Sequence, residues 1–161
     1  MAESMEIERK FLLDERPGWL DEHPSEAIRQ GYLAIVEGES EVRVREKDGR
    51  PLLTVKLGSG EVRREEEVEL DPDQFRALWP LTEGKRVSKR RHSVPHEDLT
   101  IEVDVFEGPL AGILLAEVEF DSEGASAAFD PPEWLGTEVT GDDRYANESL
   151  ATRGAPEDKA T

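Results

Sequence analysis

Ionisable and apolar side chains alternate at every second position in short segments along most of the chain. Residues 41–45 read Glu-Val-Arg-Val-Arg, and residues 116–120 read Ala-Glu-Val-Glu-Phe. Side chains of a β-strand point alternately to its two faces, so this period of two predicts strands with one apolar and one charged face. A half-buried sheet explains any single strand of this kind. It explains six or seven such strands less well, because their polar faces are almost purely ionisable.

The segments with this period predict a mainly β chain with eight strands. Asp48-Gly49 and residues 58–60 are typical of hairpin turns between them. Helices are expected after Asp71-Pro72 and after Ser122, where an N-cap residue precedes a short apolar stripe, and also at residues 25–29 and 142–150. The expected strands are residues 5–12, 31–36, 41–45, 51–57, 62–70, 85–93, 99–106 and 113–120.

Eight antiparallel strands close readily into a small barrel. If the charged faces point inward, the barrel is a tunnel with a charged lumen, and short outer helices near Phe75 and Phe129 cover its apolar exterior. Such a lumen is costly to desolvate unless its charges are paired or bind ligands. The carboxylates expected to face it are Glu6, Glu8, Glu65, Glu67, Glu102, Asp104, Glu117 and Glu119, and the cations are Lys10, Arg43, Arg45, Lys56, Lys89 and Arg91.

These two kinds of side chain predict two kinds of ligand. Clustered carboxylates suit hard divalent cations such as Mg²⁺ or Mn²⁺. Clustered arginine and lysine side chains suit phosphate oxygens, and arginine adds bidentate geometry. Together in one cavity, they predict a site for a metal-bound polyphosphate.

The composition excludes several other classes of protein. The 161 residues suffice for one domain with a core, expected at residues 1–152 and followed by a flexible C-terminal tail at residues 153–161. A formal net charge of −18 argues against general nucleic-acid binding. The chain has no cysteine, and Val94-Pro95 separates His92 from His96, so no zinc site is expected and both histidines are predicted at the surface or at strand ends. Neither a signal peptide nor an apolar stretch of roughly 20 residues is visible, which indicates a cytoplasmic protein without a membrane partner.

The start of the chain, Glu6-Ile7-Glu8-Arg9-Lys10, resembles the Glu-x-Glu-x-Lys signature of the CYTH superfamily, the triphosphate tunnel metalloenzymes. The resemblance runs through nearly the whole chain, and the compact length is similar to that of the small bacterial inorganic tripolyphosphatases. The other segments that carry the resemblance are residues 30–33, 41–45, 54–56, 89–91, 102–106, 116–120, 131–136 and 139–145.

The resemblance implies an eight-stranded antiparallel β-barrel tunnel that hydrolyses a triphosphate with Mg²⁺ or Mn²⁺. It implies that Glu6 and Glu8 serve a second metal or order the attacking water, and that Tyr32 and Lys89 tune metal preference. Glu65 and Glu67 resemble a carboxylate pair of the family, and residues 142–150 match a helix that can plug one tunnel mouth. The implied phosphate-binding residues are Lys10, Arg43, Arg45, Lys56 and Arg91, and the implied ligands of the substrate-bound metal are Asp104, Glu117 and Glu119.

Hydrolysis of inorganic tripolyphosphate to pyrophosphate and phosphate is the function expected first. A class IV-type adenylyl cyclase, a thiamine or nucleoside triphosphatase, and a non-catalytic module that binds polyphosphate or nucleotide are the alternatives. The full carboxylate set argues against the non-catalytic module, which could dispense with much of the metal site. Homodimers occur in the family, so self-association is left open.

Overall fold

The computed structural model describes residues 7–58 and 64–156, so Glu6 and the first residues of two expected strands lie outside the described residues. The described part contains eight strands in one antiparallel sheet, which confirms the expectation from the alternating pattern. The spatial order of the strands is β1-β8-β7-β6-β2-β3-β4-β5. Their bounds are β1 (Ile7–Leu12), β2 (Ser25–Val36), β3 (Ser40–Lys47), β4 (Arg50–Leu57), β5 (Arg64–Glu69), β6 (Arg86–His96), β7 (Leu99–Phe106) and β8 (Leu114–Phe120).

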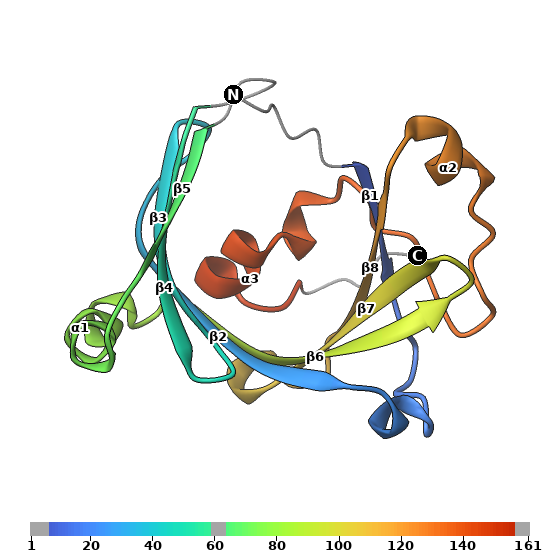
Figure 1. Cartoon of the computed structure of the whole chain (residues 1–161), viewed down its shortest axis with the longest axis horizontal. Helices are drawn as coiled ribbons and strands as arrows, with labels where there is room; N and C mark the ends of the chain where they lie inside the picture. The colour runs from blue at the N-terminus through green and yellow to red at the C-terminus, as the bar shows by residue number, and fades with distance from the viewer. Residues whose placement is uncertain (1–6, 59–63, 157–161) are drawn as a thin grey trace.

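The sheet bends around the C-terminal part of the chain into a barrel-like tunnel (Figure 1). Within the described residues, no ladder joins β1 to β5, so hydrogen bonds do not close the barrel. The edge of β1 instead binds a later segment: Leu12 N–H donates to Thr137 O and Val139 N–H donates to Lys10 O, each over 2.8 Å. Curvature, rather than a closed ladder, therefore shapes the tunnel.

The expectation of a helix at residues 25–29 is wrong, because β2 already begins at Ser25. Ser25 pairs with His92 of β6, and Ile28 pairs with both Lys47 of β3 and Lys89 of β6. Ladder hydrogen bonds to neighbouring strands outweigh a weak local preference for helix.

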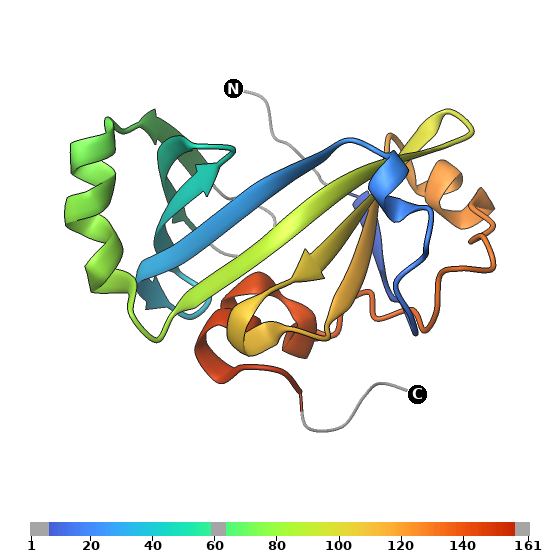
Figure 2. The ribbon, with the colours of Figure 1, turned by 90° about the horizontal axis from the view of Figure 1, so that it is seen from below.

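Two α-helices cover the convex side of the sheet (Figures 1 and 2). In α1 (Pro72–Leu78), the Asp71 carboxylate accepts from Gln74 N–H over 2.8 Å, and the Gln74 side chain accepts from Asp71 N–H over 2.9 Å. This reciprocal capping box fixes the start of the helix. In α2 (Glu123–Ala128), Ser122 is the N-cap, as the sequence predicts.

The third α-helix, α3 (Asn147–Arg153), lies on the concave side of the sheet, so not every helix is an outer one (Figure 1). It follows a short 3₁₀ helix, η4 (Asp143–Tyr145), and the extended backbone of Ala146 separates the two. The single helix expected at residues 142–150 is therefore two shorter ones. The other 3₁₀ helices are η1 (Leu20–Glu22), η2 (Trp79–Thr82) and η3 (Gly108–Leu110).

Apolar clusters lie on both faces of the sheet. The convex cluster includes Phe11, Ile101 and Phe120, and Phe129, beyond the end of α2, packs against it. The concave cluster includes Tyr32, Phe106, Leu115, Tyr145 and Leu150, so α3 is anchored to the inner face by apolar burial. Figure 2 shows α3 beside one end of the curved sheet.

Two local features complete the fold around β2 and β6. A Cβ atom on Gly31 would lie 2.4 Å from Thr82 Oγ1, so this glycine lets η2 pack directly on β2. His92 is only 1% exposed and lies inside β6, so the prediction of a surface or strand-end position is wrong for this residue. The segment before β2 folds over β6: Ser93 N–H donates to Pro24 O over 2.9 Å, and η1 contacts β6. None of the helices in residues 7–58 and 64–156 is long and apolar enough to cross a membrane.

Candidate active site

Charged side chains from neighbouring strands meet on the concave face because the antiparallel register places them opposite one another. Carboxylates make up a larger share of the pairs among β1, β8, β7 and β6 than of the pairs among β2 to β5. The opposed pairs are Lys10 and Glu117, Glu8 and Glu119, Glu102 and Glu117, Arg91 and Asp104, Tyr32 and Arg43, and Lys56 and Glu65.

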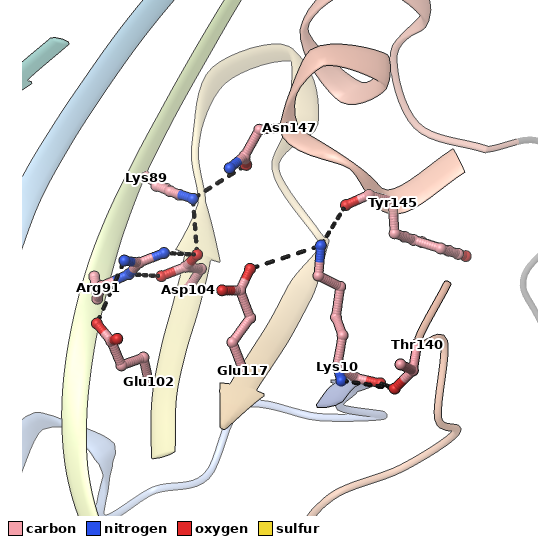
Figure 3. Close-up of polar contacts among 9 residues, drawn as sticks. All are labelled: Lys10, Lys89, Arg91, Glu102, Asp104, Glu117, Thr140, Tyr145 and Asn147. Carbon is pink, nitrogen blue, oxygen red and sulfur yellow. Dashed lines mark hydrogen bonds and ion pairs between the residues drawn. The ribbon is translucent and has the colours of Figure 1, made fainter. Parts of the chain in front are cut away.

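Asp104 is the centre of a buried group of ion pairs (Figure 3). Its Oδ2 lies 2.8 Å from Lys89 Nζ, and its Oδ1 lies 2.7 Å from Arg91 Nε. A second bond, from an Arg91 terminal nitrogen to Asp104 Oδ2 over 2.9 Å, makes the arginine contact bidentate. The side chains of Lys89 and Asp104 are only 2% and 1% exposed, so water screens this pair very little.

The electrostatics of this group follow from burial and pairing. Burial alone would raise the pKa of Asp104, but Lys89 and Arg91 outweigh it and hold the pKa below its usual range. Burial lowers the pKa of Lys89, and the charge of Asp104 opposes that shift only in part. Burial would also lower the pKa of Arg91, but its bonds to Asp104 raise it overall. Asp104 is therefore an anion at neutral pH, held between two cations.

Lys10 links β1 to both β8 and the C-terminal segment (Figure 3). Its Nζ lies 3.7 Å from Glu117 Oε1 and donates to the backbone oxygen of Tyr145 over 3.3 Å. Arg91 reaches a further carboxylate, since one of its terminal nitrogens lies 3.3 Å from Glu102 Oε2. Lys10, Lys89 and Arg91 thus each have a carboxylate neighbour.

Arg43 and Arg45 on β3 have fewer partners. Arg43 lies 3.1 Å from Glu41, whereas Arg45 has no carboxylate within 4.0 Å among the described residues. The Nε atoms of both arginines are buried without a hydrogen-bond partner in the part of the chain that the structure covers. Burial and then the nearby charges of Arg43 and Arg91 lower the pKa of Arg45. The charges of Asp104 and Glu67 oppose that shift only in part, so Arg45 is a cation without a close ion-pair partner in the described part of the chain.

Tyr32 lies directly opposite Arg43 and is 1% exposed. Its hydroxyl oxygen accepts from Gln30 Nε2 over 2.8 Å. Burial, reinforced by the negative charge of Glu41, raises the pKa of Tyr32 to about 12, so the phenol is a neutral hydrogen-bonding group at physiological pH.

The carboxylates of β5 occupy a different environment. Glu65 is opposite Lys56 and Glu67 is opposite Thr54, but all six residues of β5 are exposed. Their charges are therefore well screened by water, unlike those of Asp104 and Lys89.

The carboxylates of β1, β7 and β8 have the chemistry of a divalent metal site. Glu8 is opposite Glu119 and Glu102 is opposite Glu117, and like charges directly opposite one another destabilise a sheet. A hard divalent cation would offset that repulsion with oxygen ligands that it prefers. Within residues 7–58 and 64–156, however, no three Asp, Glu or His side chains are gathered as a metal-binding group, and Asp104 is paired with two cations.

Three residues contribute a side chain or a backbone group to this site, although the sequence patterns do not single them out. Gln30 shares a face with Tyr32, so the alternation of β2 is a signal that could have found it. Tyr145 contributes its backbone oxygen, and Asn147 accepts a hydrogen bond from Lys89 Nζ over 3.2 Å. Asn147 lies 58 residues from Lys89, and no pattern in the sequence joins the two.

Comparisons with known proteins agree with the fold. The chain is 47% identical to an inorganic triphosphatase of Nitrosomonas europaea over 149 residues, 91% of this chain and 96% of that protein. It is 37% identical to an inorganic triphosphatase of Acetivibrio thermocellus over 151 residues, 90% of this chain and 92% of that protein. A crystal structure of the inorganic triphosphatase NE1496 is similar with a TM-score of 0.77 and 43% identity, covering 92% of this chain and 95% of that one. The CYTH domain family matches residues 4–154, and the chain therefore belongs to the CYTH domain family.

Proposed function

We propose that this chain hydrolyses inorganic triphosphate to pyrophosphate and phosphate in a reaction that depends on a divalent metal. The observation that carries the proposal is that the Nε atoms of Arg43 and Arg45 are buried without a hydrogen-bond partner among the described residues. A buried donor without an acceptor is costly, and a polyanion with several phosphate oxygens is a ligand that supplies acceptors to arginine. The two relatives, both inorganic triphosphatases, favour a triphosphate as that polyanion.

The cations of the concave face are proposed to hold the phosphate groups. Arginine can bind two phosphate oxygens at once, whereas lysine acts as a point charge. Because these charges are in place before the reaction, they stabilise charge on the transferred phosphoryl group without reorganisation. The proposed phosphate-binding residues are Lys10, Arg43, Arg45, Lys56 and Arg91.

Glu117 and Glu119 are proposed to hold the metal that binds the triphosphate, and Glu6 and Glu8 are proposed to serve a second metal. When bound, a divalent metal neutralises charge on phosphate oxygens and lowers the pKa of a coordinated water. Glu6 and Glu8 are also proposed to order the attacking water. Asp104 is a proposed ligand as well, a role that requires it to release Lys89 or Arg91.

The remaining proposals concern finer properties of the enzyme. Tyr32 and Lys89 are proposed to tune the choice between Mg²⁺ and Mn²⁺, both of which suit carboxylate oxygens. Glu65, Glu67 and Glu102 are proposed to balance the positive charge of the tunnel. A cytoplasmic location is proposed from the composition of the chain, and a homodimer is proposed from the family resemblance.

Phosphate release from tripolyphosphate, ATP and thiamine triphosphate, measured in parallel with Mg²⁺, with Mn²⁺ and with a chelator, tests the proposal. We expect metal-dependent release mainly from tripolyphosphate, with pyrophosphate as the second product. Cyclic AMP and pyrophosphate from ATP, with little cleavage of tripolyphosphate, would instead identify a cyclase. Tight tripolyphosphate binding without turnover of any substrate would identify a binding module.

A further inference from the structure

Asn147 connects the C-terminal helix to the buried ion pairs of the candidate active site. Lys89 Nζ donates to Asn147 Oδ1 over 3.2 Å while it lies 2.8 Å from Asp104 Oδ2 (Figure 3). A lysine ammonium group has three N–H donors. Asp104 and Asn147 account for two of them, and the third can serve a phosphate oxygen.

The start of α3 departs from the local rule that the other two α-helices follow. Asp71 and Ser122 cap α1 and α2 with side-chain hydrogen bonds, whereas Ala146 precedes α3 without one. Asparagine is a favoured capping residue. Here, however, Asn147 is the first residue of the helix, and its side-chain oxygen accepts from Lys89. Asn147 thus does not cap its helix but contacts a residue of the candidate active site, and such a departure from local preference indicates a functional use of the residue.

The helix is held firmly enough to fix the position of this amide. Tyr145, Leu150 and Ala151 are 3%, 1% and 8% exposed and belong to the apolar cluster on the concave face. The same segment accepts a hydrogen bond from Lys10 through the backbone oxygen of Tyr145. The C-terminal segment thus contacts lysines of two strands, β1 and β6.

We propose that Asn147 is a positioning residue, which acts on the triphosphate through Lys89 rather than by contacting the substrate itself. This inference rests on the proposed function. The amide supplies an acceptor without charge, so it orients the ammonium group while leaving its positive charge available to the phosphate. A carboxylate at this position would neutralise Lys89 further, since Asp104 already pairs with it.

A double-mutant cycle tests this inference. Asn147→Leu keeps a similar size and removes the acceptor, and Lys89→Met removes the ammonium group. Because a hydrogen bond to a charged group is lost, Asn147→Leu alone should lower kcat/KM for tripolyphosphate by roughly 10- to 100-fold. In the Lys89→Met background, the same change should alter kcat/KM by less than about 2-fold, because the two residues act as one unit.

The controls separate positioning from stability. Thr152→Ala changes an exposed residue of the same helix whose hydroxyl bonds only to Glu148 O among the contacts described, and it should leave kcat/KM unchanged. Urea unfolding of all variants shows whether each remains folded at the assay temperature, and Asn147→Ser, which keeps a side-chain oxygen, should recover part of the lost activity.

The outcomes distinguish this inference from the proposed function. Turnover by the wild type together with equal losses from Asn147→Leu in both backgrounds would overturn the positioning role and leave the hydrolase intact. Absence of turnover by the wild type would overturn the proposed function and, with it, this inference.

Discussion

At the scale of single residues, Arg45 combines burial with the absence of a carboxylate within 4.0 Å in the described part of the chain, and the more distant charges of Asp104 and Glu67 favour its charged form only in part. Its pKa is lowered by burial and by Arg43 and Arg91, so the folded protein pays a free-energy cost to keep it charged. Stability alone does not account for such a residue, because replacing buried charges by apolar side chains is often neutral or stabilising. A functional role for Arg45, which lowers the stability of the fold, does account for its burial.

Arg45→Met should therefore change activity and stability in opposite directions. We expect kcat/KM for tripolyphosphate to fall by ~10²–10³, because a preorganised cationic group is lost. We expect the midpoint of urea unfolding to rise, because a desolvated charge is replaced by an apolar side chain of similar length. Arg64→Met, at an exposed position of β5, should change neither quantity appreciably. Lower stability with full activity in Arg45→Met would contradict the phosphate-binding role.

His92 predicts a pH dependence of stability. Burial, followed by the positive charge of Arg16, lowers the pKa of this imidazole below its ordinary value of 6.5. As the pH falls through 6.5, the unfolded chain takes up the proton first, so the free energy of unfolding decreases until the lower pKa of the folded state is passed. Urea unfolding at about pH 7.5 and about pH 5.5 should show this loss for the wild type. His92→Leu should reduce the difference between the two pH values, and an unchanged difference would exclude His92 as its source.

At the scale of elements, the helices divide by function as well as by position. Two cover the convex face, and α1 is held there by contacts with aromatic rings: Phe75 is 4% exposed, and the Arg29 guanidinium lies 5.0 Å from the centre of the Trp79 ring. The third, α3, contacts Lys89 from inside the curved sheet, and η4 just before it contacts Lys10. Substitutions in α1 should therefore affect folding alone, while substitution of Asn147, the first residue of α3, should reach the chemistry.

Asp71→Ala tests that division. Loss of the N-cap of α1 should lower the free energy of unfolding by about 1 kcal/mol and leave kcat unchanged. Asp71→Asn keeps a capping acceptor and should retain most of the stability. Urea unfolding and tripolyphosphate hydrolysis of the three proteins measure both effects, and a large loss of kcat in a well-folded Asp71→Ala protein would show that α1 influences the active site.

The elements also show why some features could be predicted from the sequence and others could not. The alternation in segments such as 41–45 and 116–120 predicts both the strands and the face that carries their charges, because the period of a strand is a local property. The helix expected at residues 25–29 fails because pairing with β3 and β6 is not local. The link between Lys89 and Asn147 and the inner position of α3 depend on tertiary packing, which no short pattern encodes.

At the scale of the whole molecule, one edge of the sheet is covered by another segment, whereas no segment of residues 7–58 and 64–156 pairs with the other edge. Residues 137–139 bind the edge of β1, whereas the six residues of β5 are exposed. An uncovered edge invites pairing with another chain, and charged side chains are a common protection against it. Four of the six residues of β5 are acidic: Glu65, Glu66, Glu67 and Glu69.

Two molecules that approached each other through β5 would bring glutamates against glutamates. While these carboxylates are ionised, their mutual repulsion opposes the stacking of chains into filaments or aggregates, and it opposes a homodimer that pairs through β5. Acidification and high ionic strength both weaken that repulsion, so they are the conditions in which a concentrated solution of this protein should first lose its colloidal stability.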